Sequence, residues 1–409
     1  MALSKLALIC TVAGIVLFAK PATAQGEVQP FLSDSLNIIS DESGSLNTVL
    51  ETLYNLQGHE DTTSVVAILH LGDSHIQAGF FTRIIRTSLQ KEFGNAGLGL
   101  IVPLKLAGTN QPRDYRITSD GSWAGGRCSL RKDQYTFGVS GFAVETTDSC
   151  AALTIEARYD ATNQMEYDFN KLTVFHNKAP VLLPEDDTIV SLEHYNPYAY
   201  TIELNRHVTT LPLIQNGKSN AKAKTYHGFS LENGKSGILY HVAGVNGARY
   251  DQLCGIQLLV EQSKALNPQI IVISQGTNES LMSPFSSTSF ISDIDRLVKK
   301  LKQANPNAVF ILTTPAETYR RQKRQRIPNA NIELVSKAIV TYAKENNIAY
   351  WDLFELSGGK GSSQSWKKNG LLAKDQLHFT IEGYEQLGRL FTEAFLKLYS
   401  TYVGKHRLE

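Results

Sequence analysis

The chain has 409 residues, 42% of them hydrophobic and 19% charged, which is the composition of a folded globular protein. This length exceeds what one hydrophobic core usually serves, and it predicts two domains. The formal net charge of +1 gives no case for nucleic-acid binding through bulk charge.

Residues 1–24 have the pattern of a secretory signal peptide. Lys5 supplies a positive charge, and the apolar residues 6–18 are too few to span a bilayer comfortably. Residues 22–24 are Ala-Thr-Ala, which fits the small-x-small cleavage pattern. We therefore expect export to the periplasm or the extracellular medium. No later stretch predicts a membrane span.

Residues 65–93 predict a strand, a tight turn and a helix. Residues 65–69 are small, apolar and β-branched, as in a buried strand, and apolar residues recur at helical spacing from Phe80 to Phe93. The turn between them places Ser74 at the carboxyl end of the strand, with its N–H near a helix N-terminus. Two interpretations stay open here: Ser74 is a nucleophile, or Ser74 caps the helix.

Residues 109–233 form a second type of sequence. They have no long helical period, and their short alternating apolar runs are separated by joints that contain Asn, Pro or Gly. This spacing predicts an inserted all-β domain, either a β-sandwich or a jelly roll. The α/β part is then discontinuous, with residues 25–108 before the insert and residues 234–409 after it.

The α/β pattern returns after the insert. Buried strands are predicted at 238–243, 270–274, 309–312 and 349–353. Helices are predicted at 46–56 before the insert, and at about 249–265, 291–303, 332–345 and 381–399 after it. Strands that alternate with helices predict a parallel sheet with right-handed crossovers.

Polar residues follow several of these strands. Sites in an open parallel sheet form outside the carboxyl ends of the strands, where Ser74, Gly247 and Asn278 are expected. Asp375 and His378 are three residues apart before the last helix, so the carboxylate can orient the imidazole, which can take the proton of Ser74. The Ser74 N–H, the Gly247 N–H and the Asn278 amide can form a three-donor oxyanion hole.

The four stretches, in this order, resemble the blocks of the SGNH (GDSL-like) hydrolase superfamily. The block serine falls on Ser74, the glycine on Gly247, the asparagine on Asn278, and the Asp-x-x-His on Asp375 and His378. The resemblance implies a flavodoxin-like sheet and ester hydrolysis by a serine nucleophile. It implies no metal and no cofactor.

A narrower resemblance is to bacterial peptidoglycan O-acetylesterases. It is carried by the Gly-Asp-Ser-His at 72–75, by residues 80–82 and 93–99, and by the long insert before residues 244–248. In those enzymes the insert is a carbohydrate-binding-like module. The resemblance implies an exported esterase that removes O-acetyl groups from a polysaccharide, with peptidoglycan first among the candidates. Deacetylation of plant or host glycans, acetyl transfer to a sugar, and an inactive glycan-binding protein stay open.

Other residues near the blocks have a structural and a functional interpretation. His75 either lines the site or only begins a helix, and Asp73 is expected to accept turn hydrogen bonds. Asp352, at a strand end, competes with Asp375 as the orienting carboxylate. A basic run either forms a solvated loop or contacts an anionic glycan at the rim of the site: Arg320, Arg321, Lys323, Arg324 and Arg326.

The insert and the cysteines allow further expectations. Trp123, Tyr198 and Tyr200 either pack in the β core or stack on sugars. Export permits a disulfide, and Cys128 and Cys150 are the expected pair because they are close in sequence. Cys254 lies in a helical pattern and is expected to be a free core residue. No paired Cys/His spacing predicts a metal site.

Overall fold

The computed structural model describes residues 32–58, 60–130, 134–149, 152–184, 188–215 and 223–406. The predicted signal peptide and Cys150 lie outside these residues. The described residues belong to one compact unit, Phe31–Glu409. None of the helices in this part of the chain is long and apolar enough to cross a membrane.

A six-stranded sheet positions the candidate site. Its strand order is β1-β19-β16-β15-β2-β14. The strands are β1 (Ile39–Ser40), β2 (Val65–Gly72), β14 (Gly237–Gly244), β15 (Ile270–Ser274), β16 (Val309–Thr313) and β19 (Ala349–Trp351). Every neighbouring pair is parallel except β1 with β19. The five parallel strands, numbered along the chain, have the order 2-1-3-4-5, which is the flavodoxin-like order that the family resemblance implies.

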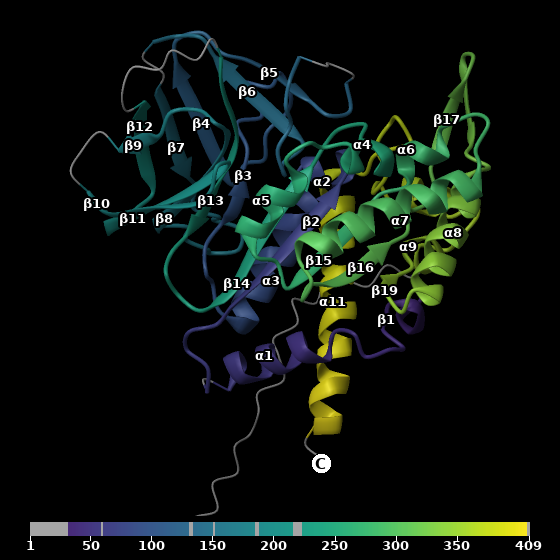
Figure 1. Cartoon of the computed structure of the whole chain (residues 1–409). Helices are drawn as coiled ribbons and strands as arrows, with labels where there is room; N and C mark the ends of the chain where they lie inside the picture. Colours follow the sequence, from purple (N-terminus) through teal and green to yellow (C-terminus); the bar gives the residue numbers. More distant parts are fainter. Residues whose placement is uncertain are drawn as a thin grey trace, which may run out of the picture. The chain divides into compact units, whose positions relative to one another are not determined.

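Helices cover both faces of this sheet (Figure 1). One core contains side chains from α1 (Asn47–Gln57), α3 (Phe80–Phe93) and α11 (Ile381–His406). The other core contains side chains from α4 (Tyr250–Cys254), α5 (Leu259–Leu266), α7 (Ser287–Ala304) and α8 (Ile332–Glu345). On β2, Ile68 faces the first core and Leu69 the second. Strands buried on both faces explain the continuous apolar runs in the sequence.

Two expected elements differ from the structure. The helix predicted at 249–265 is divided into α4 and α5, because Gly255 ends α4 by donating its N–H to the Asp251 carbonyl. The last strand ends at Trp351, since Asp352 caps the short helix α9 (Leu353–Leu356). The remaining short helices are η1 (Asp34–Leu36), α2 (Ser74–Gln77), α6 (Thr277–Ser280) and α10 (Ser363–Lys368).

The described residues between 109 and 233 form strands and loops and contain no helix. Sheet β10-β11-β8-β13-β6-β5, with β3 paired to β13, packs against sheet β4-β7-β12-β9 through a shared apolar core. The strands are β3 (Gly99–Ile101), β4 (Tyr115–Asp120), β5 (Ala124–Arg127), β6 (Phe142–Thr146), β7 (Ala152–Ala157), β8 (Phe169–Asn177), β9 (Leu182–Pro184), β10 (Ile189–Asn196), β11 (Ala199–Val208), β12 (Thr210–Gln215) and β13 (Lys224–Glu232). A carbohydrate-binding role for these strands stays a prediction.

Buried polar contacts connect the β sheets to the α/β part. Arg86 of α3 pairs with Asp114 at 2.6 Å and donates its Nε–H to the Tyr167 hydroxyl at 3.1 Å. That hydroxyl donates to Gln90, also on α3, at 3.1 Å. Because Arg86 and Asp114 are both buried, each needs the other as a partner.

The structure shows the burial of the three aromatic residues of the insert and the state of two cysteines. Tyr200 is fully buried, so it is a core residue and not a sugar-stacking one. Trp123 is half-buried, with its ring centroid 6.1 Å from that of Tyr226, and Tyr198 is also half-buried. Cys128 is a free thiol packed against the second core, and its expected partner Cys150 lies outside the described residues. Cys254 is free, as expected.

Candidate active site

Ser74 is the first residue of α2, directly after β2 and a one-residue cap. Asp73 is that cap, because its Oδ1 accepts the His75 N–H at 2.9 Å. The interpretation of Ser74 as the cap is therefore wrong, and the acceptor role expected for Asp73 is confirmed. The turn requires Gly72, since a Cβ there would lie 2.1 Å from Ile76 Cγ1. Burial raises the pKa of Asp73 to about 6, although the hydrogen bond from the His75 N–H lowers it.

The structure brings Ser74, His378 and Asp375 together. Ser74 Oγ lies 2.9 Å from His378 Nε2, and His378 Nδ1 lies 2.7 Å from Asp375 Oδ2. When Nδ1 carries a proton and donates it to Asp375, Nε2 is free to accept the proton of Ser74. The His378 and Asp375 side chains are 34% and 40% exposed, so solvent and substrate can reach them.

Asp375 also shapes the loop that carries His378. Its Oδ1 accepts the backbone N–H groups of Leu377 and His378, each at 3.0 Å. Partial burial alone raises the pKa of Asp375, but the hydrogen bonds from the His378 side chain and from these two N–H groups outweigh burial and leave the pKa lowered. The carboxylate therefore stays ionised beside the imidazole.

Gly247 lies in the loop after β14. It is exposed and has φ +78°, a left-handed conformation that favours glycine. The preceding residue is held from both sides, because the Asn246 N–H donates to Gln77 Oε1 at 2.8 Å and the Asn246 carbonyl accepts from Ser129 Oγ at 2.7 Å. The loop is thus fixed next to the turn of Ser74.

Asn278 lies on α6 after β15 and connects the other two blocks. Its Nδ2 donates to the Ala248 carbonyl at 2.9 Å and to Asp73 Oδ2 at 3.3 Å. Both hydrogens of the amide therefore have protein acceptors. The longer bond, to Asp73, is the one that a substrate oxygen could replace.

Sequence reasoning missed Glu279, the neighbour of Asn278. It is buried, and its Oε1 accepts the Tyr250 N–H at 2.7 Å, which ties α6 to the chain after Gly247. Burial raises the pKa of Glu279 to about 8. Only its position beside Asn278 could have marked it, because one acidic residue in a turn predicts no burial.

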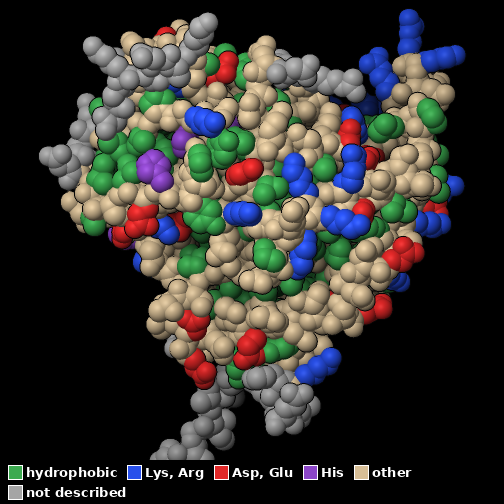
Figure 2. Space-filling model, viewed as in Figure 1, with side chains coloured by type: hydrophobic (Ala, Val, Ile, Leu, Met, Phe, Trp, Pro, Cys, Tyr) green, Lys and Arg blue, Asp and Glu red, His purple; other side chains and the backbone are tan. Residues whose placement is uncertain are grey.

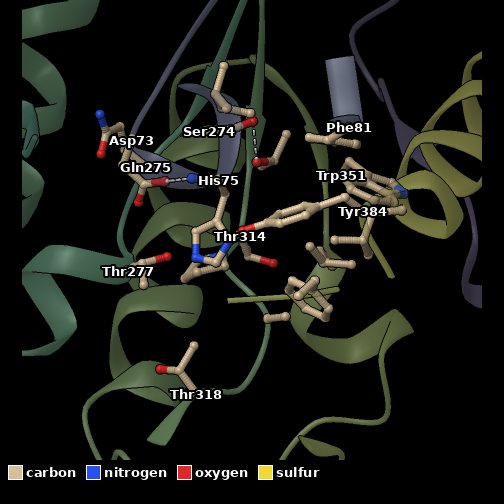
Figure 3. A pocket seen from close by; sticks show the side chains of 17 residues that line it. Asp73, His75, Phe81, Ser274, Gln275, Thr277, Thr314, Thr318, Trp351 and Tyr384 are labelled. Atoms are coloured by element: carbon tan, nitrogen blue, oxygen red, sulfur yellow. Dashed lines mark hydrogen bonds between the residues drawn. The ribbon is translucent and has the colours of Figure 1, made fainter. Parts of the chain in front are cut away.

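His75 lines a cavity of about 40 Å³ beside the turn of Ser74 (Figure 3). The cavity is also lined by Asp73, Thr277 and Tyr384. His75 Nδ1 lies 3.0 Å from the Tyr384 hydroxyl, and the His75 ring centroid is 5.3 Å from that of His378. Burial, together with the charge of His378, lowers the pKa of His75 to about 3, so His75 is a neutral neighbour of the triad.

The competing carboxylate Asp352 does not take the place of Asp375. Its Oδ1 accepts from the Thr314 hydroxyl at 2.8 Å and from the Glu355 N–H at 3.3 Å. Among the residues that the structure describes, no group of three or more His, Cys, Asp or Glu side chains is arranged to hold a metal ion.

Comparisons with known proteins agree with this arrangement. Residues 217–386 match the sequence model of the GDSL-like Lipase/Acylhydrolase family. The match contains Gly247, Asn278, Asp375 and His378 but begins after Ser74, which the strands of the insert separate from the other blocks. Among curated proteins, none matches the chain.

One of the solved structures compared with this chain has the same fold over most of its length. A peptidoglycan O-acetylesterase aligns with a TM-score of 0.70 at 18% identity, covering 91% of this chain and 99% of that chain. A lipase/acylhydrolase from Enterococcus faecalis (TM-score 0.29, 20% identity) and the acetyl xylan esterase AlAXEase (0.32, 19%) each cover 39% of this chain, and 75% and 81% of their own. The chain therefore contains a GDSL-like lipase/acylhydrolase domain, matched over residues 217–386, and it shares the fold of the first structure.

Proposed function

We propose that the protein is an exported serine esterase that removes O-acetyl groups from a polysaccharide, with peptidoglycan as the first substrate to test. The observation that carries the proposal is the hydrogen-bonded series from Ser74 through His378 to Asp375 at the carboxyl edge of the sheet. The fold shared with a peptidoglycan O-acetylesterase and the signal-like residues 1–24 support the glycan and the export. The compartment would be the periplasm or the extracellular medium.

In the proposed reaction Ser74 Oγ attacks the acetyl carbonyl carbon while His378 Nε2 takes the hydroxyl proton. The tetrahedral intermediate collapses when His378 returns this proton to the sugar oxygen, which leaves as an alcohol. Water then attacks the acetyl-Ser74 ester with His378 as the base, and acetate is released. Asp375 holds the imidazole and stabilises its cationic form.

The oxyanion is held by three donors: the backbone N–H groups of Ser74 and Gly247, and the Asn278 amide. The Asn278 bond to Asp73 is 3.3 Å long, against 2.9 Å for the bond to Ala248. We infer that the weaker bond is exchanged for one to the oxyanion while the Ala248 bond holds the side chain in place. One such donor is typically worth about 10²–10³ in kcat.

The test is acetate release by purified mature protein from O-acetylated peptidoglycan, acetylated xylan and a generic acetyl ester, with and without an oligosaccharide acceptor. We expect hydrolysis, fastest on peptidoglycan, and Ser74→Ala should lower it by about 10⁴-fold or more while the fold remains. Faster turnover on xylan would indicate plant or host glycans as substrates. Acetylated oligosaccharide as the main product would indicate a transferase, and no acetate release from any ester would indicate a glycan-binding protein.

A further inference from the structure

The basic run of the sequence forms a hairpin. Its strands are β17 (Tyr319–Gln322) and β18 (Gln325–Pro328), with Lys323 and Arg324 at the turn between them. Figure 2 shows Lys and Arg side chains gathered at the outer end of this hairpin, which Figure 1 marks with the label β17. The sequence 319–328 contains five of the 40 Lys and Arg residues of the chain and no acidic residue.

The structure describes all five hairpin cations, and none of them is paired with a described acidic side chain. Within the described part of the chain, no ion pair involves any of the five. Four of the five are exposed, and Arg320 is half-buried. Like charges at this density repel each other, so the binding of an anion to the patch lowers the free energy by reducing this repulsion. Since the net charge of the chain is only +1, the patch is local.

The base of the hairpin is joined to the catalytic loop. The Tyr319 N–H donates to the Gln376 carbonyl at 3.0 Å, and the Arg326 guanidinium donates to the Asp375 carbonyl. Gln376 is two residues from His378. From this base the four residues of β17 extend for about 13 Å, at about 3.3 Å per residue. The turn of the hairpin is therefore placed to contact the polymer that carries the ester, and not the acetyl group itself.

We propose that this hairpin binds the carboxylate groups of an anionic polysaccharide and thereby holds the polymer across the active site. The inference rests on the proposed esterase function and names its substrate class: acetylated glycans that carry carboxylates near the ester. Arg and Lys are suited to this role because guanidinium and ammonium groups donate charge-assisted hydrogen bonds to carboxylates.

A glycan explains the surface better than a membrane does. Membrane-surface segments combine cations with large apolar side chains that enter the headgroup region. Among the described residues, none of the exposed large hydrophobic side chains lies between 319 and 328. The hairpin is also hydrogen-bonded to the loop that carries His378, so its cations belong to a surface next to the proposed ester-cleaving site.

The test compares two charge-matched variants of the full mature protein. Lys323→Gln/Arg324→Gln removes the two turn cations, and Lys91→Gln/Lys264→Gln removes two exposed cations from α3 and α5. The substrates are O-acetylated carboxymethyl glucan, an O-acetylated neutral glucan and 4-nitrophenyl acetate. We expect the turn variant to lower kcat/KM about 2- to 30-fold on the carboxymethyl glucan, the range for the loss of two exposed ion pairs. The kcat/KM of the turn variant on the other two substrates should equal that of the wild type. The control variant should keep the wild-type kcat/KM on all three substrates.

Salt gives a second readout. Wild-type kcat/KM on the carboxymethyl glucan should fall between about 0.01 and 1 M ionic strength, over which the Debye length shortens from about 30 to about 3 Å, and the turn variant should respond less. Equal losses in both variants, or a loss on 4-nitrophenyl acetate, would overturn the proposal in favour of bulk charge or a structural role. Equal rates of the turn variant and the wild type on the anionic glucan would also overturn it.

A binding measurement separates this inference from the esterase proposal. The Ser74→Ala protein should bind unacetylated carboxymethyl glucan, and the addition of Lys323→Gln/Arg324→Gln should weaken this binding by a similar factor. Binding to phosphatidylglycerol vesicles without binding to the glucan would overturn the glycan assignment. Failure of the esterase proposal would instead appear as a wild-type protein that hydrolyses no acetyl ester at all, whatever its affinity for the glucan.

Discussion

Replacement of Asp375 by Asn tests the catalytic arrangement most directly. Asp375 has two separable contacts: Oδ2 faces His378 Nδ1 at 2.7 Å, and Oδ1 accepts two backbone N–H groups at 3.0 Å. Asn keeps an oxygen for the backbone contacts, so the loop should keep its shape. Its NH₂ group then faces Nδ1 and favours the tautomer in which Nε2 carries the proton. In that tautomer His378 cannot accept the proton of Ser74.

The expected loss in kcat for Asp375→Asn is about 10⁴-fold, with little change in KM. At about 1.36 kcal/mol per factor of ten this corresponds to about 5.5 kcal/mol of transition-state stabilisation. A lost charge-assisted hydrogen bond supplies only about 1.5–3 kcal/mol of that, and the wrong tautomer must supply the rest. The assay is acetate release from a soluble acetyl ester under saturating conditions, together with thermal unfolding to verify the fold.

Asp352→Asn is the matched control, because Asp352 also caps a turn and accepts a side-chain hydrogen bond, from Thr314. This variant should keep kcat near the wild-type value. If Asp352→Asn lost about 10⁴-fold while Asp375→Asn stayed active, the orienting carboxylate would be Asp352 and the geometry described above would not be the catalytic one.

Three further expectations follow from the structure. Asn278→Ala should lower kcat by about 10²–10³-fold in a steady-state assay, and an effect confined to KM would show that the amide binds substrate and does not stabilise the oxyanion. Arg86→Met should destabilise the fold by about 3–5 kcal/mol in urea unfolding, because buried Asp114 loses its partner; a loss below about 1 kcal/mol would refute this. Burial lowers the pKa of five histidines to about 3 or 4, against an unfolded value of about 6.5: His70, His75, His176, His227 and His241. Between these pKa values the unfolded chain binds more protons than the folded one, so the Tm should fall as the pH drops from about 6.5 to about 4. The raised pKa values of Asp73 and Glu279 act in the opposite direction. A Tm that rises over this pH interval would contradict the prediction.

The sheet was predictable because its strands are buried on both faces. Such strands read as continuous apolar runs, and the run before Ser74 became β2 with alternate residues in two cores. Two features were less predictable. β1 has only two residues, too few for any period, and the division between α4 and α5 depends on one glycine, Gly255. Local sequence signals at such points compete with packing that only the folded chain determines.

The residue types of the site were predictable, but their contacts were not. Asp and Ser are both favoured helix caps, so the sequence could not decide between Asp73 and Ser74. In the structure Asp73 accepts from the His75 N–H next to it and from Asn278, 205 positions away. That second contact depends on β2 and β15 lying side by side, which brings the turn that carries Ser74 and the helix that carries Asn278 to the same sheet edge.

Asp73 is therefore the residue through which the serine turn and the Asn278 donor are physically joined. In the proposed reaction the Asn278 amide exchanges its 3.3 Å hydrogen bond to Asp73 for one to the oxyanion, and the buried carboxylate loses one of its donors. Burial raises the pKa of this carboxylate to about 6, although the hydrogen bond from the His75 N–H lowers it. Burial raises the pKa of Asp73, whereas hydrogen bonds lower that of Asp375 and keep the carboxylate beside His378 ionised. Burial and hydrogen bonding thus shift the pKa values of two carboxylates near Ser74 in opposite directions.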